Sequence, residues 1–187
     1  MRLLLTAISA AALAFSALPA HAALAPGDHA PAFTANGAVA GKPVRVDLAA
    51  LLRRGPVVLY FFPAAFTGGC NAEAHAFAEK IADFKAAGAT VVGMSADTVE
   101  DLKRFSASEC AGKFAVASAS PALIAGYKAA LSQQVKGRTV SSRVSYVIAR
   151  DGRVAFVHDD MNPAEHITLT LAAVRKLAKS RTPVTAS

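Results

Sequence analysis

The chain has 187 residues, of which 53% are hydrophobic, and a formal net charge of +7. This length suits one domain with terminal extensions, and the hydrophobic content is sufficient for a buried core. The basic residues are scattered and are not interleaved with aromatic residues. The charge therefore predicts a solvated basic surface and excludes a nucleic-acid-binding stripe.

The first 22 residues have the pattern of a secretory signal peptide. Arg2 precedes an uncharged apolar run over 3–18, and Ala20-His21-Ala22 has the small-x-small form of a cleavage site. An uncleaved membrane anchor is the alternative, but the apolar run is short for a membrane span. We therefore expect cleavage after Ala22 and a periplasmic or secreted mature chain.

After this segment, strand-like and helix-like stretches alternate. Short apolar runs bounded by Gly, Pro or Asp predict strands, and apolar positions spaced by three to four residues predict helices. In chain order we expect strands at 32–36 and 44–47, a helical turn at 48–54, a strand at 57–62, a helix at 71–87, a strand at 90–94, a helix from 98 towards 110, a strand at 113–118, a short helix at 121–127, strands at 143–148 and 154–157, and a helix at 164–178.

This order of elements predicts an α/β protein with a thioredoxin-like fold. The β-α-β unit over 57–94 requires a parallel crossover connection, and Asp151-Gly152 between two apolar runs predicts an antiparallel hairpin. We therefore expect a mixed central β-sheet flanked by helices, with an N-terminal β-hairpin extension. The folded domain is expected over 23–180, and a disordered tail over 181–187.

The stretch over 57–73 carries the strongest chemical signal. Its apolar strand is stopped by Pro63, a loop containing Gly68-Gly69 follows, and Cys70 stands where the next helix begins. Unpaired N–H groups and the positive end of the helix dipole favour a thiolate over a thiol at such a position. Cys70 is therefore predicted to be an activated nucleophile.

Cys110 is the second cysteine of the chain. A pair of cysteines in an exported protein predicts a disulfide, and a structural bridge across this loop would stabilise the fold by roughly 4 kcal/mol. Such a bridge needs no glycine loop or helix start around Cys70, which weakens this interpretation. A buried free thiol at Cys110 is the other alternative.

Four histidines are scattered along the mature chain: His29, His75, His158 and His166. None is spaced from the cysteines as the ligands of a metal site are, so no metal is expected.

Three residues form the pattern Pro-x-x-x-Thr-x-x-Cys directly after an aromatic strand: Pro63, Thr67 and Cys70. Thr67 lies three residues before Cys70, so its hydroxyl can reach the sulfur or an oxygen bound beside it. With this pattern the chain, over about 25–180, resembles the peroxiredoxins of the alkyl hydroperoxide reductase/thiol-specific antioxidant superfamily. It is most similar to the bacterioferritin-comigratory (Q-type) subfamily, although Gly69 and Asn71 depart from the usual residues at their positions.

The resemblance implies a thiol-dependent peroxidase, an antioxidant enzyme without a bound cofactor, that reduces hydrogen peroxide and organic hydroperoxides. Cys70 would be the peroxidatic cysteine and become a sulfenic acid, which Cys110 would resolve as an intramolecular disulfide of the atypical 2-Cys type. The other place for a resolving cysteine in the subfamily holds His75 here. The family arginine that completes the site corresponds to Arg143; Arg138 lies nearby but outside the family pattern.

Two further residues are expected to support the site. Glu73 is expected in the first turn of the helix, where a carboxylate suits the dipole and can fix a basic partner, and Phe66 is expected to wall the pocket. The reductant implied for an exported peroxidase is a dithiol outside the cytoplasm, such as a thioredoxin-like protein. No nucleic acid and, after cleavage, no membrane is expected as a partner.

The sequence is also compatible with two other functions. One is a thiol/disulfide oxidoreductase acting on proteins, which the absence of a Cys-x-x-Cys motif disfavours. The other is a binding or chaperone module that keeps the thioredoxin fold without turnover.

Overall fold

The computed structural model describes residues 23–134 and 137–180 of the chain. The expected signal peptide (1–22) and the expected tail (181–187) lie outside the described residues. The elements are β1 (Thr34–Val39), β2 (Lys42–Asp47), α1 (Leu48–Arg54), β3 (Val57–Phe61), α2 (Gly68–Ala86), β4 (Thr90–Ser95), α3 (Val99–Ser108), β5 (Ala115–Ser118), α4 (Pro121–Gly126), β6 (Val144–Ile148), β7 (Val154–Asp159), the 3-10 helix η1 (Pro163–Glu165) and α5 (His166–Ser180).

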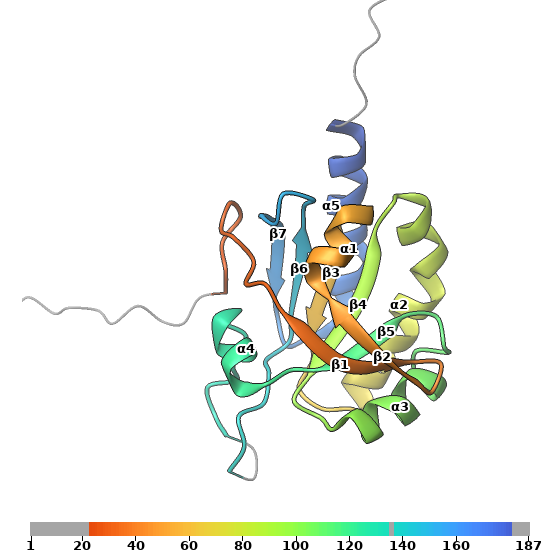
Figure 1. The fold of residues 1–187 in the computed structure, drawn as a ribbon, viewed down its shortest axis with the longest axis vertical. Helices are drawn as coiled ribbons and strands as arrows, with labels where there is room; N and C mark the ends of the chain where they lie inside the picture. The colour runs from red at the N-terminus through yellow and green to blue at the C-terminus, as the bar shows by residue number, and fades with distance from the viewer. Residues whose placement is uncertain (1–22, 135–136, 181–187) are drawn as a thin grey trace, which may run out of the picture.

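The described strands form one seven-stranded sheet in the order β2-β1-β5-β4-β3-β6-β7 (Figure 1). Strands β3, β4 and β5 pair in parallel, and the pairs towards both edges are antiparallel. The N-terminal hairpin joins the sheet where Gly37 of β1 pairs with Ala117 of β5. A Cβ at Gly37 would collide with the carbonyl oxygen of Val116, so this close approach requires glycine. The predicted thioredoxin-like fold with a mixed sheet is confirmed.

Strand β3 lies in the middle of the sheet and is buried along its whole length. Its even-numbered residues, such as Tyr60, pack into one core cluster with residues of α2, α3 and α5. Its odd-numbered residues, such as Leu59, pack into a second cluster with residues of α1 and α4. A strand held on both faces gives a rigid base for the loop that follows its last residue.

Two helix starts differ from those expected. Helix α2 begins at Gly68 and not at Asn71, because Thr67 has the extended backbone of an N-cap residue, with φ −100° and ψ 147°. Glu73 therefore lies in the second turn of α2 and not in the first. The final helix is preceded by the separate 3-10 turn η1, in which Asn162 accepts a hydrogen bond from the N–H of Ala164. Among the helices that the structure describes, none is long and apolar enough to cross a membrane.

Candidate active site

The loop between β3 and α2 is held in place by hydrogen bonds from the end of the neighbouring strand. The Ala65 N–H donates to Asp97 Oδ2 at 2.6 Å, and the Ser95 hydroxyl donates to the same oxygen at 2.9 Å. Phe66 has a positive φ of 63°, which turns the chain towards the helix. Asp97 is not among the site residues predicted from the sequence. Its position directly after a strand parallel to β3 was the available signal, because parallel strands end at one edge of a sheet.

Cys70 is the third residue of α2 and only 2% exposed. Its Sγ accepts a hydrogen bond from Nη2 of Arg143 at 3.4 Å. Strand pairing explains the contact between residues so distant in sequence. Val144, the first residue of β6, pairs with Phe61, the last residue of β3. The preceding residue, Arg143, therefore lies beside the start of α2.

The guanidinium of Arg143 is fixed on three sides. Besides the bond to Cys70, Nη1 donates to Glu73 Oε2, and Nε donates to the carbonyl oxygen of Met161 at 2.9 Å. Arg143 is 4% exposed, so these acceptors replace water around a buried charge. A Cβ at position 69 would lie 3.2 Å from Nη2, so Gly69 leaves room for the guanidinium. This geometry gives a physical reason for one departure from the family pattern.

Glu73 is buried behind Arg143 and has a perturbed carboxyl group. Burial raises the pKa of Glu73 from 4.5 to about 7, although the charge and the hydrogen bond of Arg143 oppose the shift. Its second oxygen, Oε1, has no hydrogen-bond partner among the described residues. Nδ1 of His166 lies 3.7 Å from Oε1. The carboxylate therefore anchors Arg143 through one oxygen only.

The hydrogen bonds of His166 define its tautomer. Its Nε2 is 2.8 Å from the carbonyl oxygen of Asp160, which can only accept, so Nε2 carries the proton. Nδ1 then accepts from the hydroxyl of Ser145 at 2.8 Å. Burial lowers the pKa of His166 to about 4, so the ring is neutral at physiological pH. Nδ1 lies 3.7 Å from Glu73 Oε1, and the neutral ring gives the carboxylate no counter-charge on that side.

The remaining motif residues lie in the loop and around it. The Thr67 hydroxyl donates to the carbonyl oxygen of Ala64 at 2.9 Å and makes no cap bond to α2. Pro63 follows the end of β3, as expected. Phe66 is 46% exposed and packs edge-on against Phe105, with ring centroids 5.4 Å apart. Phe66 thus lies at the surface, in the loop that leads to Cys70.

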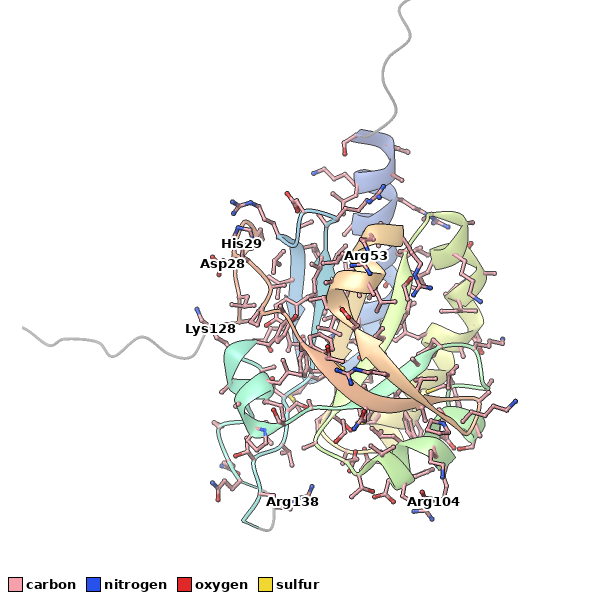
Figure 2. All side chains as sticks on the ribbon, viewed as in Figure 1. Asp28, His29, Arg53, Arg104, Lys128 and Arg138 are labelled. Atoms are coloured by element: carbon pink, nitrogen blue, oxygen red, sulfur yellow. The ribbon has the colours of Figure 1, made fainter. Side chains whose placement is uncertain are left out.

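Arg138 is not brought to Cys70. Its Nη2 donates to the carbonyl oxygen of Ala96 at 2.9 Å, and its side chain is exposed in the loop before β6 (Figure 2). Of the two candidate arginines, the structure places only Arg143 beside the sulfur.

Cys110 lies in a tight turn just after α3 and is fully buried. Both cysteines are free thiols and belong to the same core cluster. Burial raises the pKa of the Cys110 thiol far above its ordinary value, and the neighbouring carboxylate of Glu109 raises it further. The turn is tied to α2 by two contacts: His75 Nε2 to Glu109 Oε2 at 3.0 Å, and Lys113 Nζ to the carbonyl oxygen of Ala78 at 3.1 Å.

The sheet carries a reduced thiol in the first turn of a helix, next to a buried arginine, which is an arrangement suited to a nucleophilic cysteine. Residues 26–157 match the model of the AhpC/TSA family. Chloroplast peroxiredoxin Q of Sedum lineare is 34% identical over 141 residues, which are 73% of this chain and 71% of the relative. The chain belongs to the AhpC/TSA family and, within it, to the Q-type peroxiredoxins.

Solved structures agree with this assignment. Peroxidoxin BcpB from Mycobacterium tuberculosis superposes with a TM-score of 0.70 at 29% identity, covering 81% of this chain and 97% of that one. The bacterioferritin comigratory protein of Xanthomonas campestris, described for its alkyl peroxide reduction activity, superposes with a TM-score of 0.66 at 25% identity, covering 76% and 91%. The chain is therefore a thiol-dependent peroxidase.

Proposed function

We propose that Cys70 reduces hydrogen peroxide and organic hydroperoxides and that Cys110 resolves the oxidised sulfur as an intramolecular disulfide. The observation that carries the first half is the contact of Cys70 Sγ with Nη2 of Arg143, whose Nε and Nη1 are held by two further acceptors. A fixed cation beside a sulfur can stabilise charge as it moves from the sulfur to a peroxide oxygen, without reorganising first.

In the first step, the Cys70 thiolate attacks one peroxide oxygen. The S–O bond forms as the O–O bond breaks, the sulfur is oxidised, and the leaving alkoxide or hydroxide takes up a proton to become an alcohol or water. Arg143 and the N–H groups at the start of α2 stabilise the oxygens. The Thr67 hydroxyl, whose own proton is donated to Ala64, offers its oxygen as an acceptor for the O–H of the bound peroxide. Cys70 ends as a sulfenic acid.

In the second step, Cys110 attacks the Cys70 sulfenic acid, an S–S bond forms, and the oxygen leaves as water. Cys110 cannot do so as it stands, because burial keeps it protonated and a thiolate is the attacking species. The segment 109–113 must first detach from α2. This requires the Glu109 contact with His75 and the Lys113 contact with Ala78 to break. Exposure to water then lowers the thiol pKa and frees the sulfur to move.

A dithiol reductant completes the cycle by thiol–disulfide exchange. The signal-peptide pattern over 1–22 supports a periplasmic or secreted enzyme, so we propose an extracytoplasmic thioredoxin-like protein as the reductant. Support for an organic hydroperoxide as a substrate comes from the Xanthomonas campestris relative and its alkyl peroxide reduction activity.

The test is a count of thiols by mass spectrometry after the reduced protein has been incubated with stoichiometric hydrogen peroxide. We expect the loss of two hydrogens in the native chain and no reaction in Cys70→Ser. Cys110→Ser should trap a sulfenic acid on Cys70. Inert native protein would overturn the role of Cys70, and unchanged turnover of Cys110→Ser would overturn the role of Cys110.

A further inference from the structure

A second concave site lies away from the cysteines, between the N-terminal hairpin, α1 and the last turns of α2. Its volume is about 360 Å³, which falls within the range of pockets that hold small organic ligands. Most of its lining is apolar. The apolar lining includes Val44, Val46, Leu51, Ile81, Val91 and Phe114.

The strand register explains why this cavity exists. Strand β5 begins at Ala115, which pairs with Val92 of β4. Thr90 and Val91, at the start of β4, therefore have no neighbour in β5. Both residues line the cavity, together with Ala89 just before the strand. The opening in the sheet is therefore part of the fold and does not depend on a flexible loop.

Positive charge surrounds this apolar interior. Four basic residues line the cavity: Arg45, Arg54, Lys85 and Lys113. Within 23–134 and 137–180, the first three form no ion pair with a carboxylate and no side-chain hydrogen bond. All 13 acidic residues of the chain lie in these ranges. Lys113 donates one of its three protons to the backbone, so it can still bind an anion.

One carboxylate also lines the cavity, but it is already engaged. Asp47 precedes α1 and accepts a hydrogen bond from the N–H of Ala50 through Oδ1. Four cations against one capping carboxylate leave the rim of the cavity strongly positive. An apolar interior with such a rim is complementary to a molecule with one anionic end and one alkyl chain.

We propose that this cavity binds a medium-chain fatty carboxylate, with the alkyl chain among the valines and the carboxylate among the basic residues of the rim. The site is separate from the peroxidase site. Cys70 lies in the first turn of α2 and Lys85 in the last, about 22 Å apart along the helix. In Figure 2, Arg104, which covers the ring of Phe66, lies at the lower edge of the view, and Arg53 of α1 lies well above it.

The test is isothermal titration of the reduced protein with octanoate, and with 1-octanol as the uncharged probe. We expect Arg54→Ala combined with Lys85→Ala to weaken octanoate binding about tenfold, because two charge-assisted contacts are lost. Arg53→Ala, on the same helix but outside the cavity lining, should bind as the native chain does. Equal binding of octanoate by the double variant, or of octanol by the native chain, would overturn the proposal.

A second pair of variants tests the cavity without changing charge. Ala50 lines the cavity, whereas the exposed Ala49 does not. Ala50→Phe should reduce octanoate affinity at least about fivefold, and Ala49→Phe should leave it unchanged. All these variants should keep their peroxide turnover, and this retained activity would show that they are folded. Loss of octanoate binding in both phenylalanine variants, or in neither, would contradict the cavity assignment.

Sedimentation with phosphatidylglycerol vesicles distinguishes a free carboxylate from a lipid headgroup. We expect octanoate to bind in solution and the protein to stay in the supernatant of the vesicles at physiological salt. Sedimentation that depends on Arg54 and Lys85, without any heat from octanoate, would assign these residues to a membrane surface and overturn the proposal.

Discussion

The two cysteines have the same burial and opposite surroundings. Cys70 and Cys110 are 2% and 0% exposed and share one core cluster. Cys70 receives a hydrogen bond from a guanidinium, whereas the nearest charge to Cys110 in sequence is the carboxylate of Glu109, which raises its pKa together with burial. The comparison teaches that burial by itself does not decide the reactivity of a thiol. What differs between the two thiols is the sign of the neighbouring charge, a guanidinium beside Cys70 and a carboxylate beside Cys110.

The largest expected effect comes from removing the cation that distinguishes the two sites. Arg143→Gln should lower kcat/KM for hydrogen peroxide by about 10²–10³-fold, the usual loss when one preorganised donor is removed from a developing negative charge. The measurement is the steady-state rate with a saturating reductant. Arg138→Gln is the matched control and should keep full activity, because the Arg138 side chain donates to the backbone of Ala96 and does not contact Cys70. Similar losses in both variants would show that Arg143 has no special role.

The next effect concerns the carboxyl group that holds Arg143. The folded-state pKa of Glu73 is raised from 4.5 to about 7, so the native state binds this proton more tightly than the unfolded state. The resulting stability is fully present below about pH 4.5 and is lost as pH rises through 7. Across this pH range, the free energy of unfolding falls by at most about 3 kcal/mol through this one group.

Glu73→Gln cannot titrate, so this variant isolates the effect of that one carboxyl group. Between pH 5 and pH 8, the native chain should lose stability relative to Glu73→Gln when unfolding is followed in urea. Other carboxyl groups cancel in the comparison. Parallel pH curves for the two proteins would show that the Glu73 pKa is not raised.

A smaller effect is expected from loosening the segment that carries Cys110. His75→Leu combined with Lys113→Met removes both polar side-chain contacts that tie this segment to α2. Because these contacts are partly exposed, disulfide formation should accelerate only about three- to tenfold. The rate of sulfenic acid formation at Cys70 should stay the same. Stopped-flow fluorescence or rapid quench with mass detection separates the two steps.

The control for this variant is Lys80→Met, which removes an exposed ion pair on the same helix, with Asp83. Unchanged resolution in the double variant would show that opening of the segment does not limit disulfide formation.

The smallest effect is expected at the two glycines before Cys70. A Cβ at Gly69 would lie 3.2 Å from Nη2 of Arg143, whereas a Cβ at Gly68 meets nothing within 4 Å. Gly69→Ala should therefore displace the guanidinium slightly and lower kcat/KM about two- to fivefold, since catalytic contacts depend on small displacements. Gly68→Ala should be neutral. Equal rates for both variants would contradict the close fit at Gly69.

Much of the fold was predictable from local patterns. The strand before Pro63, the helix that carries Cys70 and the Asp151-Gly152 hairpin follow from hydrophobic periodicity and turn residues, which act over a few residues. The start of α2 was less predictable, because two glycines carry little helical preference and the extended backbone of Thr67 sets the boundary. The separate turn η1 was not predicted for a similar reason, since the cap formed by Asn162, and not residue preference, sets where this turn begins.

The sequence by itself pointed to Cys70 as the candidate nucleophile, because the strand, loop and helix start that surround Cys70 are contiguous in the chain. Through Pro63, Thr67 and Cys70 it also showed a resemblance to the peroxiredoxins, and the match of residues 26–157 to the AhpC/TSA family confirms that family. Only the tertiary structure decided the contacts made across the sheet: the three acceptors around Arg143, the hydrogen bonds of Asp97, and the burial of Cys110. These contacts join segments that are distant in sequence. They depend on strand register, which no local pattern specifies.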